Sequence, residues 1–250
     1  MNIAEKAKDI FKSSQEPVVE IVSEMFLEGI AGTVAPGVVS CVLAYKQRRQ
    51  ERMFECFMIE VSEKLALFEE KLSLLDSNEL KEFKDKYFGI VSDYVLEEVQ
   101  TEKIKYIVNG FINLSSIKHI SEDFVLSYYD TLKELRMHDI VVLKFYYDLY
   151  SFFGLERKKY TDVIRELNIE YEQFEAIREK LLRVGLLTTK REQNQDDLYE
   201  NMVKIQKNLE KLESGKKVRL DKLKTVDKRD SFRISKFGNK FIEFFINEVS

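Results

Sequence analysis

Histidine and cysteine are the side chains that most readily bind metals or act as nucleophiles, and the chain has two of each: His119, His138, Cys41 and Cys56. Neither histidine has a second histidine or a cysteine three or four residues away, so the sequence contains no helical metal-binding pair of that kind. If Cys41 and Cys56 lie on one helix, about 22 Å separates them at 1.5 Å per residue, which is too far for a disulfide bond. We therefore expect no bound metal and a reducing compartment, the cytoplasm.

Other catalytic patterns are also missing from the sequence. It has no glycine-rich phosphate-binding loop and no nucleophile motif around a serine or cysteine. Carboxylates are frequent because 34% of the residues are charged, and solvated helix faces supply many of them without a catalytic role. The sequence thus predicts a protein that is not an enzyme, with no cofactor and no small-molecule substrate.

The elements that position any functional residue are expected to be helices. Of the 250 residues, 44% are hydrophobic, whereas only 2 are proline and 9 are glycine. This composition favours long helices with short connections and is too apolar for a disordered chain. A net charge of −4 gives no general attraction to nucleic acid or anionic membranes. We predict a mainly α fold, with an N-terminal helical bundle over residues 1–120 and a second domain over residues 121–250.

Residues 29–45 are the most unusual stretch of the bundle, because none of them is charged. A membrane-spanning helix needs about 20 apolar residues, and Pro36 and Gly37 interrupt this shorter run. A basic stretch that begins at Lys46 follows it. The favoured interpretation is a hairpin buried between helices. The alternatives are an element that touches or enters a membrane from its surface and a membrane-spanning helix.

A long helix is predicted from Val38 to Leu75, because apolar side chains recur along it at spacings of three and four residues. This spacing is typical of a coiled-coil seam. Such a stripe can pack within its own chain or form an interface between subunits, and the periodicity allows both. The candidate interface residues are Phe54, Phe57, Val61, Leu65 and Phe68.

Two further helices are expected between this bundle and the C-terminal region. Ser121 is a suitable N-cap for a helix that ends near Leu135, since acidic residues follow it in the first turn. Asp139 is a candidate N-cap for a second helix over residues 140–151, which is apolar enough to lie in the core.

The order of elements after residue 160 is that of a winged helix. Two short helices are expected over residues 160–184, Gly185 ends the second of them, and strands are predicted at 186–190 and 231–235. A last apolar helix follows Ser235. The prediction for this domain is a winged-helix-like fold with a small β-wing.

The second helix of this pair is acidic at its start, with Glu170, Glu172 and Glu175. In a DNA-binding winged helix the corresponding helix carries the basic residues that contact phosphates. Carboxylates at that position repel the DNA backbone. A protein-binding or structural role is therefore favoured for this helix.

An insert over residues 191–230 separates the two predicted strands, where a wing normally has a short turn. Its first half is expected to form a helical arm over Asp197–Glu213, whose apolar residues have coiled-coil spacing and are candidate partner or oligomer contacts: Leu198, Met202, Ile205 and Leu209. Its second half is basic and is a candidate contact for nucleic acid or an acidic partner: Lys216, Lys217, Arg219, Lys222, Lys224, Lys228 and Arg229. No aromatic residue is interleaved there, which argues against base stacking.

Three parts of the sequence resemble the Abi-alpha-like proteins of bacteria and prophages, which are associated with abortive infection. They are the uncharged segment 29–45 that leads into Lys46 and a long helix, the apolar helix opened by Asp139, and the closing strand, Phe-Gly and apolar helix over 232–242. The insert 191–230 departs from the family's pattern. The resemblance implies a phage-related role in defence, immunity or counter-defence and supplies no catalytic residues.

The sequence thus favours a non-enzymatic protein that works by helix-mediated assembly and by binding a protein partner, either itself or another chain. Two alternatives remain. One is a winged-helix DNA-binding regulator that uses the basic residues 216–229. The other is a membrane-acting effector that inserts residues 29–45, which would place the protein at the membrane periphery.

Overall fold

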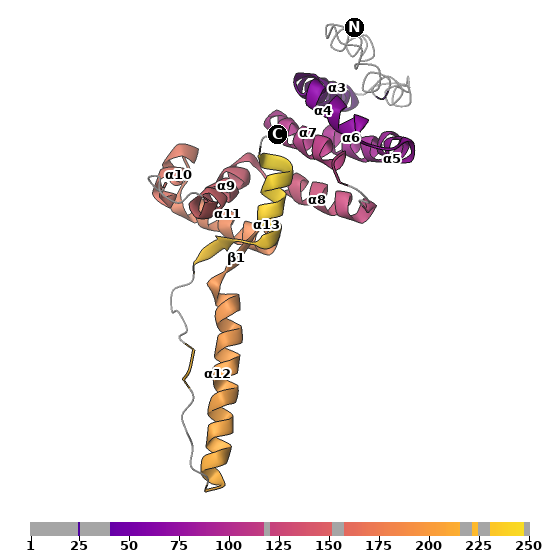
Figure 1. Cartoon of the computed structure of the whole chain (residues 1–250). Helices are drawn as coiled ribbons and strands as arrows, with labels where there is room; N and C mark the ends of the chain where they lie inside the picture. The colour runs from indigo at the N-terminus through magenta and orange to yellow at the C-terminus, as the bar shows by residue number, and fades with distance from the viewer. Residues whose placement is uncertain are drawn as a thin grey trace. The chain divides into compact units, whose positions relative to one another are not determined.

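The computed structural model describes residues 25, 41–117, 121–151, 158–215, 222–224 and 231–247. Within these residues the chain is mainly helical, as predicted, and its strands form one two-stranded sheet (Figure 1). The chain divides into two compact units, of which unit 1 comprises residues 1–137 and 241–250 and unit 2 comprises residues 138–240. The boundary expected after residue 120 is therefore displaced, because the next helix and the end of the chain both pack into unit 1.

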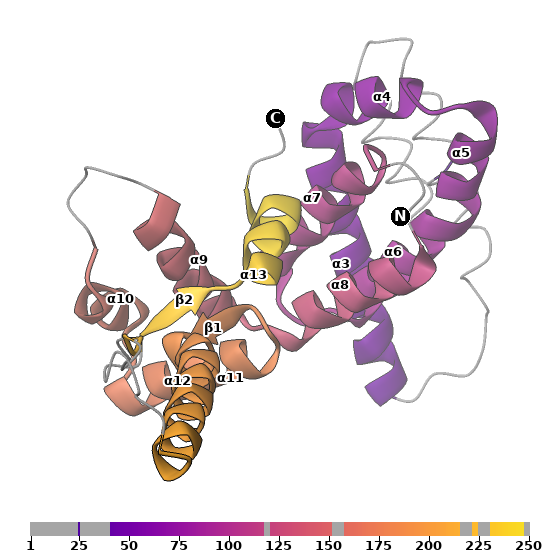
Figure 2. The same ribbon diagram turned by 60° about the horizontal axis from the view of Figure 1, so that its bottom comes forward.

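Unit 1 is built from α3 (Cys41–Glu63), α4 (Leu65–Ser73), α5 (Ser77–Glu82), the π-helix η2 (Phe83–Tyr87), α6 (Phe88–Glu97), the short 3-10 helix η3 (Thr101–Lys103), α7 (Ile104–Leu114), α8 (Glu122–Glu134) and the π-helix η4 (Ile242–Ile246). α3 packs against both α6 and α7 (Figures 1 and 2). α7 also packs against η4. Of the uncharged segment 29–45, only 41–45 belongs to the described residues, where it forms the start of α3. The interpretations of residues 29–40 lie outside the described residues.

The long helix predicted to run as far as Leu75 is broken at Lys64, whose φ of −114° and ψ of 18° leave the helical region. No proline or glycine marks this position in the sequence. The side chain of Lys64 crosses to α7 and donates a hydrogen bond from Nζ to Asn109 Oδ1 at 2.6 Å. Beyond the break, α4 places Phe68 against Phe111 of α7, with the ring centroids 5.1 Å apart. The break therefore serves the packing of α4 on α7.

Phe111 is the centre of the aromatic core of unit 1. It contacts Phe57, Phe68 and Phe83, with ring centroids between 5.0 and 5.7 Å apart. The five residues predicted as a possible subunit interface all belong to this core and are at most 8% exposed: Phe54, Phe57, Val61, Leu65 and Phe68. Their stripe packs within its own chain, so the interface assignment for these five residues is corrected.

The end of the chain closes unit 1. The side-chain amides of Asn109 and Asn113 on α7 donate hydrogen bonds to the backbone carbonyls of Phe245 and Phe244, each at 2.9 Å. Gly110 lies between the two asparagines, and a Cβ there would be only 2.4 Å from the ring of Phe245. The missing side chain thus lets η4 approach α7 closely enough for both amide contacts.

Unit 2 consists of α9 (Met137–Ser151, apart from its first residue), α10 (Tyr160–Leu167), α11 (Tyr171–Arg183), β1 (Leu187–Thr189), α12 (Lys190–Glu213), β2 (Phe232–Ile234) and α13 (Lys236–Phe241, apart from its last residue). β1 and β2 pair in antiparallel fashion, with Leu187 opposite Ile234 and Thr189 opposite Phe232. Gly185, with a φ of 77°, follows α11 and permits the turn into β1. The predicted strand pair and the glycine that ends the preceding helix are therefore confirmed.

The strand β2 is held on α11 by an arginine between two aromatic rings. The guanidinium of Arg178 lies 4.4 Å from the ring centroid of Phe232 and 5.4 Å from that of Phe174. Phe174 is fully buried. Such cation–π contacts stabilise by about 1–2 kcal/mol when they are partly desolvated. This packing fixes the sheet from which α12 departs.

Candidate functional site on helix α12

α12 starts at Lys190, directly after β1, which is earlier than the arm helix was expected to begin. Its 24 residues extend for about 36 Å at 1.5 Å per residue. The helix ends before Gly215, whose φ of 70° favours glycine. Its main contact with another element is with β1. Figure 1 shows α12, in orange, running away from the β1–β2 pair of the same unit.

One face of α12 carries a row of apolar side chains that we call the apolar stripe: Leu198, Met202, Ile205, Leu209 and Leu212. All five are between 45% and 61% exposed. They recur at alternating spacings of four and three residues, which keeps them on one face of the helix. The first four are the arm residues predicted as partner contacts, and the structure places them together on one exposed helix face. A contiguous exposed apolar surface of this kind is typical of a protein-interaction site.

The burial pattern of α12 is the reverse of that of an ordinary surface helix. Among the α12 side chains that the structure describes, only Asn201 and Asn208 are buried, with exposures of 8% and 7%. Polar residues are normally on the outside of a helix and apolar residues on the inside. Here the asparagines on one flank are covered while the apolar stripe faces solvent. The sequence did not signal this reversal, because periodicity shows which residues share a face and not which face is covered.

The residues 222–224 lie along α12 and cover the flank at Asn201. The side chain of Asn201 donates to the carbonyl of Lys224 and accepts from its backbone amide, and both bonds measure 2.9 Å. The ammonium of Lys224 contacts Asp197 Oδ1 at 2.6 Å and Glu200 Oε2 at 3.1 Å. The hydrogen bonds to these two carboxylates raise the pKa of the Lys224 ammonium above its ordinary value. Two acidic partners on its own chain thus neutralise this cation.

Five of the seven basic residues predicted to contact nucleic acid or an acidic partner lie outside the described residues: Lys216, Lys217, Arg219, Lys228 and Arg229. Of the two that the structure describes, Lys224 is bound to α12. The use of Lys224 as a phosphate contact would require breaking both ion pairs. Lys224 therefore favours a role in positioning the segment on the arm, whereas Lys222 is exposed.

Replacing Asn201 by alanine is expected to release residues 222–224 from α12. The substitution removes two hydrogen bonds, each contributing about 1 kcal/mol, so the released state should become about thirtyfold more populated. Trypsin cleavage after Lys222 and Lys224 measures this population when opening is fast relative to cleavage. Gln206→Ala is the matched control, because Gln206 is an exposed amide on α12 whose side chain donates a hydrogen bond to Glu210 one turn away, at 3.4 Å. Equal cleavage rates in both variants would contradict the anchoring role of Asn201.

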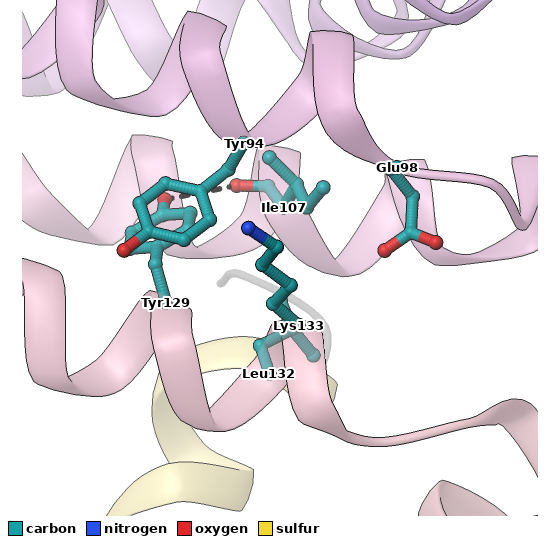
Figure 3. A pocket seen from close by; sticks show the side chains of 6 residues that line it. All are labelled: Tyr94, Glu98, Ile107, Tyr129, Leu132 and Lys133. Carbon is teal, nitrogen blue, oxygen red and sulfur yellow. Dashed lines mark hydrogen bonds between the residues drawn. The ribbon is translucent and has the colours of Figure 1, made fainter.

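A small gap in unit 1 is lined by Tyr94, Glu98, Ile107, Tyr129, Leu132 and Lys133 (Figure 3). It has no room for a water molecule. The hydroxyl groups of its two tyrosines are already hydrogen-bonded: Tyr129 Oη donates to the carbonyl of Ile107 at 3.1 Å, the dashed line in Figure 3, and Tyr94 Oη donates to Asp130 outside the gap at 2.6 Å. The gap is therefore part of the packing between α6, α7 and α8 and offers no ligand site.

The described part of the chain contains no cluster of three or more histidine, cysteine, aspartate or glutamate side chains that could hold a metal ion. Cys56, the cysteine whose side chain is described, is a free thiol and half-buried. Burial and the nearby Glu55 raise the pKa of this thiol, although Arg52 opposes the shift. A raised pKa lowers the thiolate fraction, which is the reactive form. Across the described ranges, no helix combines the length and apolarity needed to cross a membrane.

Comparison of the chain with protein-family models, with curated proteins and with solved structures finds no match in any of the three. The similarity to the Abi-alpha-like proteins therefore stays a prediction from the sequence. The apolar stripe of α12 is the feature on which a functional proposal can be based.

Proposed function

We propose that this protein is a non-enzymatic assembly protein, two copies of which bind each other through the apolar stripes of their α12 helices. The observation that carries the proposal is the exposure of the whole stripe on a helix whose neighbouring asparagines are buried. Two such stripes can form a two-stranded coiled coil, in which apolar residues spaced by three and four interlock along the seam.

The residues that flank the stripe support a second copy as the occupant. In a coiled coil these flanking positions face the partner helix and decide which helices pair. On α12 the exposed flank carries Tyr199 and Gln206, both uncharged, before Glu213 at the end of the helix, whereas Asn201 and Asn208 on the other flank are buried within their own chain. Two identical helices can thus approach along the exposed flank without like-charge repulsion over most of its length.

The expected affinity follows from the area that the stripe can bury. Complete burial of a leucine-sized side chain is worth about 1.5–3 kcal/mol, and these side chains start about half exposed. The five residues of each copy then contribute ~8–15 kcal/mol in total, against an association cost of about 4–15 kcal/mol. With a gain in the middle of its range and an association cost near the lower end of its own, at about 4–6 kcal/mol, the balance corresponds to a reversible dimer with a dissociation constant of roughly 1–100 μM.

Sedimentation equilibrium of the full chain across this concentration range tests the proposal. The apparent mass is expected to rise from 29.6 kDa towards twice that value as concentration increases. A constant monomer mass at the highest concentration would overturn the self-assembly proposal.

We infer that the assembly unit is a winged-helix-like domain with α12 inserted between its two strands. The support is the order of α10, α11, β1 and β2, together with the antiparallel pairing of the strands. Because α11 starts with acidic residues and Lys224 is bound to the arm, protein binding is favoured over DNA binding for this domain. The phage-related context is proposed from the family resemblance alone.

A further inference from the structure

We propose that the first half of α3 is a docking surface for anionic lipid membranes. Four residues there, Tyr45, Arg48, Arg49 and Arg52, are spaced as i, i+3, i+4 and i+7 and therefore share one helix face. Tyr45 is 70% exposed, and Arg48 and Arg52 are also exposed. We call these four residues the basic face. The proposal is independent of the self-assembly of α12.

The cations of the basic face have no acidic partner among the described residues. Some exposed lysines of the same unit do form ion pairs, as Lys86 does with Glu122 and Lys133 with Glu97. Arg48, Arg49 and Arg52 form no ion pair with any other described residue, and Arg49 Nε is buried without a hydrogen-bond partner. Three guanidinium groups on one face, with no acidic partner in the described part of the chain, favour a local positive potential, although the chain as a whole carries a net charge of −4.

The stability of α3 does not explain why its basic residues lie in its first half and its acidic residues towards its end. The other half of α3 is acidic, and Glu60 and Glu63 lie in its last turn, which has no basic residue. Negative charge near the C-terminus of a helix is unfavourable because of the helix dipole. The segregation of basic from acidic residues along α3 therefore points to a partner that meets the basic half.

An anionic membrane fits the basic face better than a nucleic acid does. Tyrosine is enriched at the headgroup level of membranes, and Tyr45 is at the end of the face that adjoins the uncharged residues 29–44 in the sequence. A cluster of Lys and Arg directly next to an apolar segment is the usual pattern for binding phosphatidylserine-type headgroups. Lys46 adds a fourth cation on the edge of the same turn. The face has one aromatic residue, at its end, and lacks the interleaved aromatics that bind bases.

Co-sedimentation of the full chain with lipid vesicles tests the proposal. The chain is expected to bind vesicles of phosphatidylcholine with about 30% phosphatidylserine, and to bind pure phosphatidylcholine far more weakly. Raising the salt concentration from about 0.05 to 0.5 M should weaken binding, since the Debye length shrinks. The variant Arg48→Gln/Arg52→Gln should bind about 25-fold more weakly, at roughly fivefold per cation.

The matched control is Lys207→Gln/Lys211→Gln, which changes the net charge equally at two exposed positions of α12 outside the stripe. It should retain the vesicle binding of the unmodified chain. Circular dichroism checks that both variants are folded. The proposal is overturned if the unmodified chain stays in the supernatant with anionic vesicles, or if the control loses as much binding as the arginine variant. It is also overturned if the arginine variant loses affinity for a DNA duplex and keeps its vesicle binding.

Discussion

Ile205→Glu is expected to abolish self-association of the full chain and to leave its fold intact. Ile205 is the middle residue of the apolar stripe and is 45% exposed. In a centred pair of stripes it meets its own copy whether the two helices run parallel or antiparallel. Two glutamates would then face each other in a partly desolvated seam, where like charges are unfavourable and unpaired carboxylates lose hydration. We expect the dissociation constant to rise by at least about 100-fold.

Val203→Glu is the matched control for this prediction. Val203 is also β-branched and lies on α12, but off the stripe. Sedimentation equilibrium of the three proteins should give a dimer for the unmodified chain and for Val203→Glu, and a monomer for Ile205→Glu. Thermal unfolding should change little in either variant, because both positions are at least partly exposed and surface substitutions usually shift stability by about 0.5 kcal/mol or less. Equal association of both glutamate variants would remove the stripe as the interface.

The two apolar stripes show what hydrophobic periodicity can and cannot establish. The stripe that runs from Phe54 on α3 to Phe68 on α4 and the stripe of α12 both have spacings of three and four, so the sequence predicts for both which residues share a face. The sequence cannot show what covers that face. α6 and α7, which follow later in the sequence, pack against α3, and the first stripe is buried, whereas the stripe of α12 remains exposed. Only the tertiary arrangement separates a core from a candidate interface.

Local sequence patterns predicted the ends of helices correctly where the end depends on neighbouring residues. Ser121 is the N-cap of α8 and accepts a hydrogen bond from the backbone amide of Phe124, as predicted. Gly185, predicted to end the preceding helix, follows α11 and has a positive φ. In both cases the deciding interaction lies within a few residues, so the sequence alone was sufficient.

Local sequence patterns gave a wrong prediction where a residue distant in sequence decides the role of a side chain. Asp139 was predicted as an N-cap, but α9 already begins at Met137. Asp139 is buried instead and accepts a hydrogen bond from Lys180 Nζ at 2.6 Å. A carboxylate near a helix start has the same sequence pattern in both roles. The partner on α11 could not be inferred from residues around position 139.

Lys103→Met is expected to destabilise unit 1 by about 3–5 kcal/mol, the usual cost of leaving one member of a buried ion pair alone. The Lys103 side chain is completely buried, and its Nζ lies 2.6 Å from Glu98 Oε2. The same ammonium donates to the carbonyl of Lys133 at 3.3 Å. Without it, the Glu98 carboxyl group would lose its counter-ion in a site with almost no access to water. Urea unfolding of the full chain measures the change through the shift in midpoint at constant slope.

The second substitution Glu98→Gln should recover most of the stability lost in Lys103→Met. Glu98 Oε1 accepts hydrogen bonds from the backbone amides of Val99 and Gln100, at 2.7 and 2.9 Å. A glutamine oxygen can accept both, so the double variant removes the buried charge and keeps the bonds that turn the chain from α6 into η3. Replacing a buried pair by neutral residues is often close to neutral in free energy.

The exposed ion pair between Lys133 and Glu97 provides the control for the substitutions at the buried pair. Its side chains are 49% and 60% exposed, and exposed ion pairs contribute about 0–1 kcal/mol. Lys133→Met should therefore cost about 1 kcal/mol or less, although the Nζ–Oε2 distance of 2.5 Å is as short as that of the buried pair. If the double variant were as unstable as Lys103→Met alone, the loss would come from packing around the lysine chain. If the double variant instead regains most of the stability that Lys103→Met loses, the uncompensated Glu98 carboxyl group is the cause.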